Sequence, residues 1–166
     1  MRGTLPVMRL ITALLAILLA VTAAHAQSGW GYYANGRYGY EVDIPPGFEG
    51  QGESDNGDGE VFLLDGRVGK LTVWGGYFAL EPDFESEANA RFADDRDDGW
   101  NVISQAATPG WATWSAEKSG RVIVQHMIAL CDASGYAALR LEYAQTDRPR
   151  LDDLVEPLVT SFKSAC

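Results

Sequence analysis

Between residues 100 and 144 the sequence contains four strand-like segments separated by very short turns, and this spacing constrains the fold more than any other feature. The segments cover residues 100–106, 111–117, 122–130 and 136–144. A crossover between parallel strands needs a dozen or more residues, whereas these turns have four or five, so the spacing predicts an antiparallel meander. Segment 122–130 is apolar on both faces and is expected to be a central strand.

Strand signals also precede the meander. Residues 38–44 alternate in polarity, with Tyr38, Tyr40, Val42 and Ile44 on one face. The strand should stop at Pro45, because proline cannot donate to a ladder. After a polar stretch at 50–59, segments 61–64 and 69–77 flank Asp65-Gly66, a dipeptide typical of a β-hairpin.

Residues 83–98 predict an amphipathic helix. Asp83 is suited to cap it, Phe84, Ala88 and Phe92 recur at four-residue spacing, and Gly99 ends it. Four aspartates near its C-terminus oppose the helix dipole and should weaken the last turn.

A second helix is expected from about residue 149 to 163, with Asp147 as its cap. Its apolar stripe consists of Leu151, Leu154, Val155, Leu158 and Phe162. Pro157 removes one backbone hydrogen bond from the helix, so the pattern predicts a kink or a late start.

The first 26 residues have the pattern of a secretory signal peptide. Arg2 and Arg9 provide the positive start, an apolar run of about 12 residues follows, and Ala24-His25-Ala26 forms a small-x-small cleavage site. Because a membrane span takes roughly 20 apolar residues, cleavage is favoured over anchoring. We therefore expect one domain, residues 27–166, in the periplasm or secreted, with no transmembrane segment in the mature chain.

The mature chain is strongly acidic. The whole sequence has 13 Lys+Arg and 23 Asp+Glu, and loss of Arg2 and Arg9 leaves 11 against 23, a net charge of −12. Nucleic acids and anionic membrane surfaces bind clustered cations, so this charge argues against both as partners.

Cys131 and Cys166 are expected to form a disulfide. The strand after Cys131 runs away from its turn for about 30 Å at ~3.3 Å per residue. The C-terminal helix returns roughly 20 Å at ~1.5 Å per residue, and the short tail covers the remainder. Cys166 should therefore arrive near Cys131, although two unpaired thiols are the alternative.

Several phrases, together with this order of elements, resemble small exported bacterial proteins of the PsbP-like superfamily, which in turn resembles a nuclear-import factor that binds the GTPase Ran. The phrases lie at residues 38–48, 56–59 and 139–143, followed by Leu154-Val155 and Ser161-Phe162. The similarity spans residues 32–163, with Pro157 and the cysteine pair outside its pattern. It implies an α+β fold, an antiparallel sheet flanked by helices as an α/β/α sandwich. It implies a binding or assembly role with no catalytic residue and no cofactor.

The residues contain few signals of catalysis. His126 is the one histidine after the cleavage site, and it alternates with apolar residues, which favours a structural role over that of a catalytic base. Nucleophile-elbow, Cys-x-x-Cys and phosphate-loop motifs are missing from the sequence. An uncharacterised hydrolase, for example one using a carboxylate pair, stays an alternative.

Residues 54–65 partly match a calcium loop. Asn56 and Asp58 fall at liganding positions, but Asp65 replaces the bidentate glutamate and Ser54 replaces the first aspartate. Asn-Gly and Asp-Gly are also ordinary turn dipeptides. A calcium or small-ligand protein is therefore an alternative, with Asn56, Asp58 and Asp65 as candidate ligands.

Aromatic residues are the remaining candidates for an interface. They are Tyr32, Tyr33, Trp74, Trp111 and Trp114. Trp111 and Trp114 are an odd number of residues apart on one strand, so they should face opposite sides of the sheet. The sequence thus favours an exported, non-enzymatic binding or assembly domain whose partner is an envelope protein.

Overall fold

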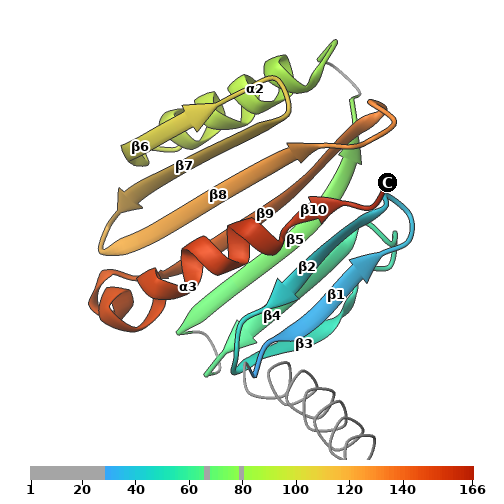
Figure 1. The fold of residues 1–166 in the computed structure, drawn as a ribbon. Helices are drawn as coiled ribbons and strands as arrows, with labels where there is room; N and C mark the ends of the chain where they lie inside the picture. Colours follow the sequence, from blue (N-terminus) through green and yellow to red (C-terminus); the bar gives the residue numbers. More distant parts are fainter. Residues whose placement is uncertain (1–28, 66–67, 79–80) are drawn as a thin grey trace, which may run out of the picture. The chain divides into compact units, whose positions relative to one another are not determined.

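The computed structural model describes residues 29–65, 68–78 and 81–166 (Figure 1). The expected signal peptide, residues 1–26, lies outside them. The strands are β1 (Gly31–Asn35), β2 (Tyr40–Ile44), β3 (Phe48–Glu53), β4 (Gly59–Leu64), β5 (Gly69–Tyr77), β6 (Asn101–Ala107), β7 (Trp111–Lys118), β8 (Arg121–Ala129), β9 (Gly135–Ala144) and β10 (Lys163–Ser164). The helices are α2 (Phe84–Asp97), the 3-10 turn η1 (Gln145–Asp147) and α3 (Arg148–Ser161). None of the helices in these ranges is both long and apolar enough to cross a membrane.

Seven of the strands form one antiparallel sheet in the order β3-β4-β5-β9-β8-β7-β6. The predicted meander is confirmed as β6 to β9, and the predicted hairpin as β4 and β5. Strand β8 lies between β7 and β9 and is buried on both faces along most of its length, as its two-sided apolar pattern predicts.

A second, three-stranded sheet, in the order β1-β2-β10, was not predicted. Only β2 had been expected, and its start at residue 38 was two residues early. Strand β1 has no clean alternation, and β3 in the large sheet is exposed from its second residue onward. Both strands are held by cross-strand partners, so their own side chains carry little strand signal.

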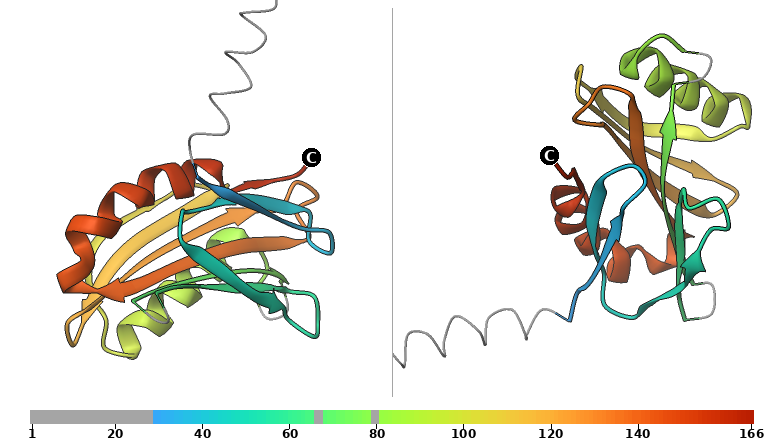
Figure 2. Two further views of the ribbon diagram at one scale, coloured as in Figure 1. Left: turned by 90° about the horizontal axis from the view of Figure 1, so that it is seen from below. Right: turned by 90° about the vertical axis from the view of Figure 1, so that its right-hand side faces the viewer.

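The register of the large sheet decides which layer each side chain joins. Thr72, Arg140, Gln125 and Trp114 are consecutive cross-strand partners on one face, and α2 packs on that face. The opposite face is covered by α3 together with the small sheet (Figure 2). The class is therefore α+β as expected, but sheet dominates, and one of the two covering layers is shared between a helix and strands.

Helix α2 matches its prediction closely. The Asp83 carboxylate accepts a hydrogen bond from the backbone N–H of Ser86 at 2.9 Å, and Gly99, with φ of +86°, follows the end of the helix. Its apolar side chains Phe84 and Ala88 are buried against Met127 of the sheet. This contact fixes the helix on the sheet.

Helix α3 differs from its prediction at two points. Asp147 makes no side-chain capping bond, and Pro149 in the first turn supplies the start instead, because proline there gives up no intrahelical hydrogen bond. The helix also continues through Pro157, so of the two predicted outcomes, a kink or a late start, the late start is wrong. Pro157 is exposed, so water can solvate the carbonyl that its ring leaves unpaired.

The predicted disulfide joins Cys131 to Cys166, with Cα atoms 5.9 Å apart. The bond lies beside β10, where the Ser164 hydroxyl accepts a hydrogen bond from the N–H of Cys131 at 3.1 Å. The Ala165 N–H donates to the Gly39 carbonyl at 2.7 Å. The C-terminal tail thus ties the turn after β8 to the small sheet.

Removing this bond should destabilise the fold. The loop that it closes spans 35 residues, for which the loss of loop-closure entropy predicts about 2–4 kcal/mol. We expect the variant Cys131→Ser, Cys166→Ser to unfold at lower urea concentration by this amount, with an unchanged circular dichroism spectrum in water. A change below about 0.5 kcal/mol, or two alkylatable thiols in the denatured oxidised protein, would contradict the assignment.

Candidate functional site

The candidate calcium residues do not converge in the structure. Asn56 and Asp58 lie in the turn between β3 and β4, whereas Asp65 follows the far end of β4. Six residues of strand separate the two ends by roughly 20 Å at ~3.3 Å per residue. Asp65 instead forms an ion pair with Arg150 of α3 at 2.7 Å. Within the described ranges there is no group of three or more His, Cys, Asp or Glu able to hold a metal ion.

Asp58 belongs to a partly exposed polar cluster at the protein surface. One carboxylate oxygen accepts from the Arg37 guanidinium at 2.8 Å and from the Tyr38 hydroxyl at 3.0 Å, and the other accepts from the Asn56 amide at 2.6 Å. The positive charge beside this carboxylate is therefore Arg37. The hydrogen bonds that Asp58 accepts from Arg37 and Tyr38 connect the β1–β2 turn to the β3–β4 turn.

Asn35 organises the same cluster and was missed in the sequence. It is buried, its amide nitrogen donates to the Gly57 carbonyl at 2.9 Å, and its oxygen accepts from the N–H of Tyr38 at 2.9 Å. Asn35-Gly36 is a turn dipeptide, so the signal was present. The hydrogen bond from Asn35 to Gly57 is a tertiary contact, which the local sequence pattern does not predict.

The two candidate tyrosines lie on β1 and differ in burial. Tyr32 is 63% exposed, and its hydroxyl donates to Glu41 at 2.6 Å. Tyr33 is half-buried and packs edge-on against Phe62, with ring centroids 5.7 Å apart. Tyr33 thus helps to join the small sheet to the large one.

The three candidate tryptophans lie on the large sheet. As predicted, Trp111 and Trp114 face opposite sides: Trp114 is 2% exposed under α2, whereas Trp111 is 39% exposed on the other face. Trp74 is partly buried in the same cluster as Trp114. The five aromatics do not form one patch: Tyr33, Trp74 and Trp114 contribute to packing, whereas Tyr32 and Trp111 keep much of their surface exposed.

His126 is a buried core residue. Its ring lies between Trp111, at 6.1 Å between centroids, and Phe162, at 6.2 Å. Nδ1 has no hydrogen-bond partner among the described residues. Burial lowers the pKa of His126 from 6.5 to about 4, so the imidazole is neutral near pH 7.

A buried ionic cluster under the end of α2 was also missed. Asp95 accepts from the Trp114 indole N–H at 2.7 Å and from Arg140 at 2.9 Å. The Arg140 guanidinium also lies 5.5 Å from the centre of the Trp100 ring. Asp95 is one of the four aspartates that were expected to weaken the end of α2, yet its contacts hold that end on the sheet. The sequence does not distinguish Asp95 from the other three.

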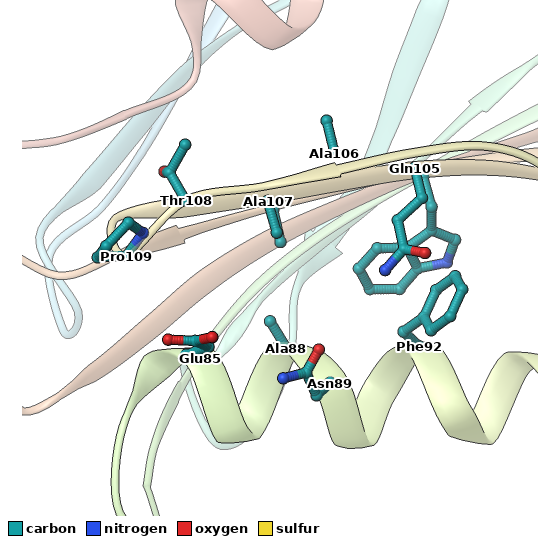
Figure 3. A pocket seen from close by; sticks show the side chains of 11 residues that line it. Glu85, Ala88, Asn89, Phe92, Gln105, Ala106, Ala107, Thr108 and Pro109 are labelled. Carbon is teal, nitrogen blue, oxygen red and sulfur yellow. The ribbon is translucent and has the colours of Figure 1, made fainter.

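A groove lies between α2 and the outer strands β6 and β7, with a volume of about 220 Å³ (Figure 3). We call it the α2–β6 groove. Ala88, Phe92 and Trp114 form its apolar floor. Gln105 and Ala107 project toward the helix from β6, whereas their neighbour Ala106 projects away from it (Figure 3).

A second hollow, of about 460 Å³, adjoins the first. The two share Glu85 and Pro109, and the second is lined further by Phe78, Pro82, Asp83, Phe84, Ala129 and Ala133. The described residues that line the two hollows include two carboxylates, Asp83 and Glu85, and no lysine or arginine. The groove therefore combines an apolar floor with a negatively charged rim. These features favour a ligand segment with apolar or cationic side chains.

Acid should destabilise the fold through His126. The folded-state pKa of about 4 lies below the unfolded value of 6.5, so the unfolded chain binds the proton more readily. The contribution is complete above pH 6.5 and is lost as the pH falls toward 4, by roughly 2–3 kcal/mol. We expect urea unfolding to show this loss in the wild type and not in His126→Leu. Parallel pH profiles for the two proteins would contradict the assignment.

Neutralising Asp95 should be costly, because Arg140 and the Trp114 indole then lose an ionised partner in a buried position. We expect Asp95→Asn to lower the free energy of unfolding by about 2–4 kcal/mol. Asp94→Asn is the matched control, since Asp94 is exposed on the same turn. Equal effects of the two substitutions, measured by urea unfolding, would show that the buried pair is not what fastens α2.

Comparison with known proteins gives structural likeness without close sequence relatives. No protein-family model matches the chain, and no curated protein matches it. The solution structure of cyanobacterial PsbP, CyanoP, from Synechocystis sp. PCC 6803 is similar, with a TM-score of 0.63 and 16% identity over 82% of this chain and 93% of that one.

Two further solved structures share the architecture. The Ran-binding protein Mog1p of Saccharomyces cerevisiae has a TM-score of 0.60 and 11% identity over 84% of this chain and 97% of its own. LpqN of Mycobacterium tuberculosis, involved in cell envelope biogenesis, has a TM-score of 0.51 and 14% identity over 82% and 91%. The resemblance seen in the sequence is thus confirmed at the level of fold: this chain has the PsbP-like fold.

Proposed function

We propose that this protein is an exported, non-enzymatic binding or assembly-accessory domain of the cell envelope, which holds a protein partner at the α2–β6 groove. The observation that carries the proposal is the groove itself, with its apolar floor open beside an exposed outer strand. Apolar hollows with a polar rim are the usual anchoring points of protein ligands.

Export is supported by the cysteine pair. Cys131 and Cys166 are both exposed and joined in a disulfide, and such bonds persist in oxidising compartments such as the periplasm. The signal-peptide pattern of residues 1–26 agrees with this location. The acidic sequence, with a net charge of −10, agrees with a partner other than nucleic acid.

A binding role is supported by the solved structures with the same fold. Mog1p is a Ran-binding protein and LpqN is involved in cell envelope biogenesis. Neither description names an enzyme. A shared fold does not by itself establish a shared function, so the proposal rests mainly on the groove of this chain.

The surroundings of His126 favour a non-enzymatic role. A general base needs a hydrogen-bond partner that orients it and access to the proton that it removes. The ring of His126 packs between two aromatic side chains instead, and its pKa is low because it is buried.

Crosslinking in the host envelope tests the proposal. We expect the tagged protein to capture one partner reproducibly, and Ala107→Trp to lose it, because the new indole fills the groove. Ala106→Trp is the matched control: the two alanines are adjacent and exposed on β6, but the side chain of Ala107 projects toward α2 and that of Ala106 projects away from it.

Two results would contradict the proposal in different ways. Capture that survives both substitutions would place the binding surface elsewhere on the domain. No reproducible partner, combined with thermal stabilisation by calcium that is lost in Asp58→Ala, would favour the calcium-binding alternative.

A further inference from the structure

We propose that the free edge of β6 takes up an extended segment of the partner as an added strand, and that this segment carries apolar and cationic side chains on the face that it turns toward α2. The inference rests on the proposed binding function and specifies the chemistry of the partner. It follows from three features of the α2–β6 groove: an unpaired backbone edge, hollows of apolar character, and a rim of one charge sign.

The backbone edge is the first feature. Strand β6 ends the large sheet, and no other strand among the described residues pairs with its outer side. Its seven residues, Asn-Val-Ile-Ser-Gln-Ala-Ala, include no charge and no proline, and the side chain of Ile103 is 55% exposed. Alternate N–H and C=O groups of an edge strand point outward and can pair with an incoming chain.

The opposite edge of the same sheet is protected in the ways that natural sheets use. Strand β3 carries Glu49 and Glu53, and its pairing with β4 is interrupted between Gly50 and Glu53. Charges and bulges of this kind discourage strand addition. Strand β6 has one irregularity, between Val102 and Ser104, followed by an uninterrupted stretch to Ala107. The uncharged edge is thus the one that adjoins the groove.

The hollows determine the side chains of the added strand. Gln105 and Ala107 face α2, and alternate residues of a strand paired with β6 would face the same way (Figure 3). Those residues would lie near the groove floor of Ala88, Phe92 and Trp114. Apolar side chains at alternate positions are therefore favoured.

The negative charge at the rim of the hollows determines which charged side chains the added segment carries. Asp83 and Glu85 are exposed, and no lysine or arginine in the described part of the chain lines either hollow. A lysine or arginine in the segment can pair with Glu85, which lies where the hollows meet. A second copy of this chain would instead bring another Glu85 and a further net charge of −10. Electrostatic complementarity therefore favours a cationic segment of another protein over self-pairing.

Selection from random peptides tests the inference without knowledge of the natural partner. The bait is the protein as its host processes it, and the probes are displayed random peptides of the length of β6. We expect enriched sequences to carry net positive charge with apolar residues at alternate positions. Binding of the enriched peptide should weaken about tenfold in Glu85→Lys, and stay unchanged in Asp153→Lys, an exposed control on α3.

Backbone pairing is tested on the same peptide by N-methylation of alternate residues. A methyl group removes one donor, so methylating the set that pairs with β6 should abolish binding, whereas methylating the other set should leave it intact. New hydrogen-exchange protection should appear at residues 101–107. These readouts leave the protein unaltered, so misfolding cannot produce them.

Several results would overturn the inference. They are enrichment of acidic or unpatterned peptides, no enrichment at all, tolerance of both methylated sets, or protection of β6 in a concentration-dependent dimer of the protein alone. The proposed function would still stand if an envelope partner were captured and then lost in Ala107→Trp. The proposed function would fail, independently of the peptide results, if no envelope partner were captured.

Discussion

The pairing of β5 with β9 is the constraint on which the rest of the structure depends. It aligns Gly69–Tyr77 with Gly135–Tyr143, residues far apart in the chain, and it joins the hairpin to the meander as one sheet. The small sheet packs on this seam: a Cβ at Gly75 would lie 2.4 Å from the Tyr38 ring, closer than atoms can approach. Glycine at this position therefore lets the two sheets meet.

One consequence of this arrangement is that the two faces of the large sheet are covered differently. One face lies under α3 and the small sheet, and the disulfide fastens this layer through the C-terminal tail. Of the elements that the structure describes, α2 alone lies on the other face, held at one end by Phe84 and at the other by Asp95. A single helix leaves hollows beside it, and these form the groove next to β6.

The candidate residues identified from the sequence mostly serve the fold. Asp58 matched part of a calcium loop because polar turns and calcium loops use the same residue types, and in the structure its charge is balanced by Arg37. Trp114 packs under α2. The groove was not predicted because its floor and rim come from α2, β6, β7 and the turn at Pro109. Residue type is visible in a sequence, but convergence of side chains from distant segments is not.

The sequence by itself determined the elements whose signals are local. Alternation and turn spacing specified β4 to β9, the Asp83 cap and Gly99 specified α2, and element lengths were enough to bring Cys131 to Cys166. The tertiary structure alone decided the small sheet, the ion pair of Asp95 with Arg140, and the exposure of β6. The physical reason is that hydrophobic periodicity and capping act within a few residues, whereas strand order and side-chain contacts depend on which distant segments pair.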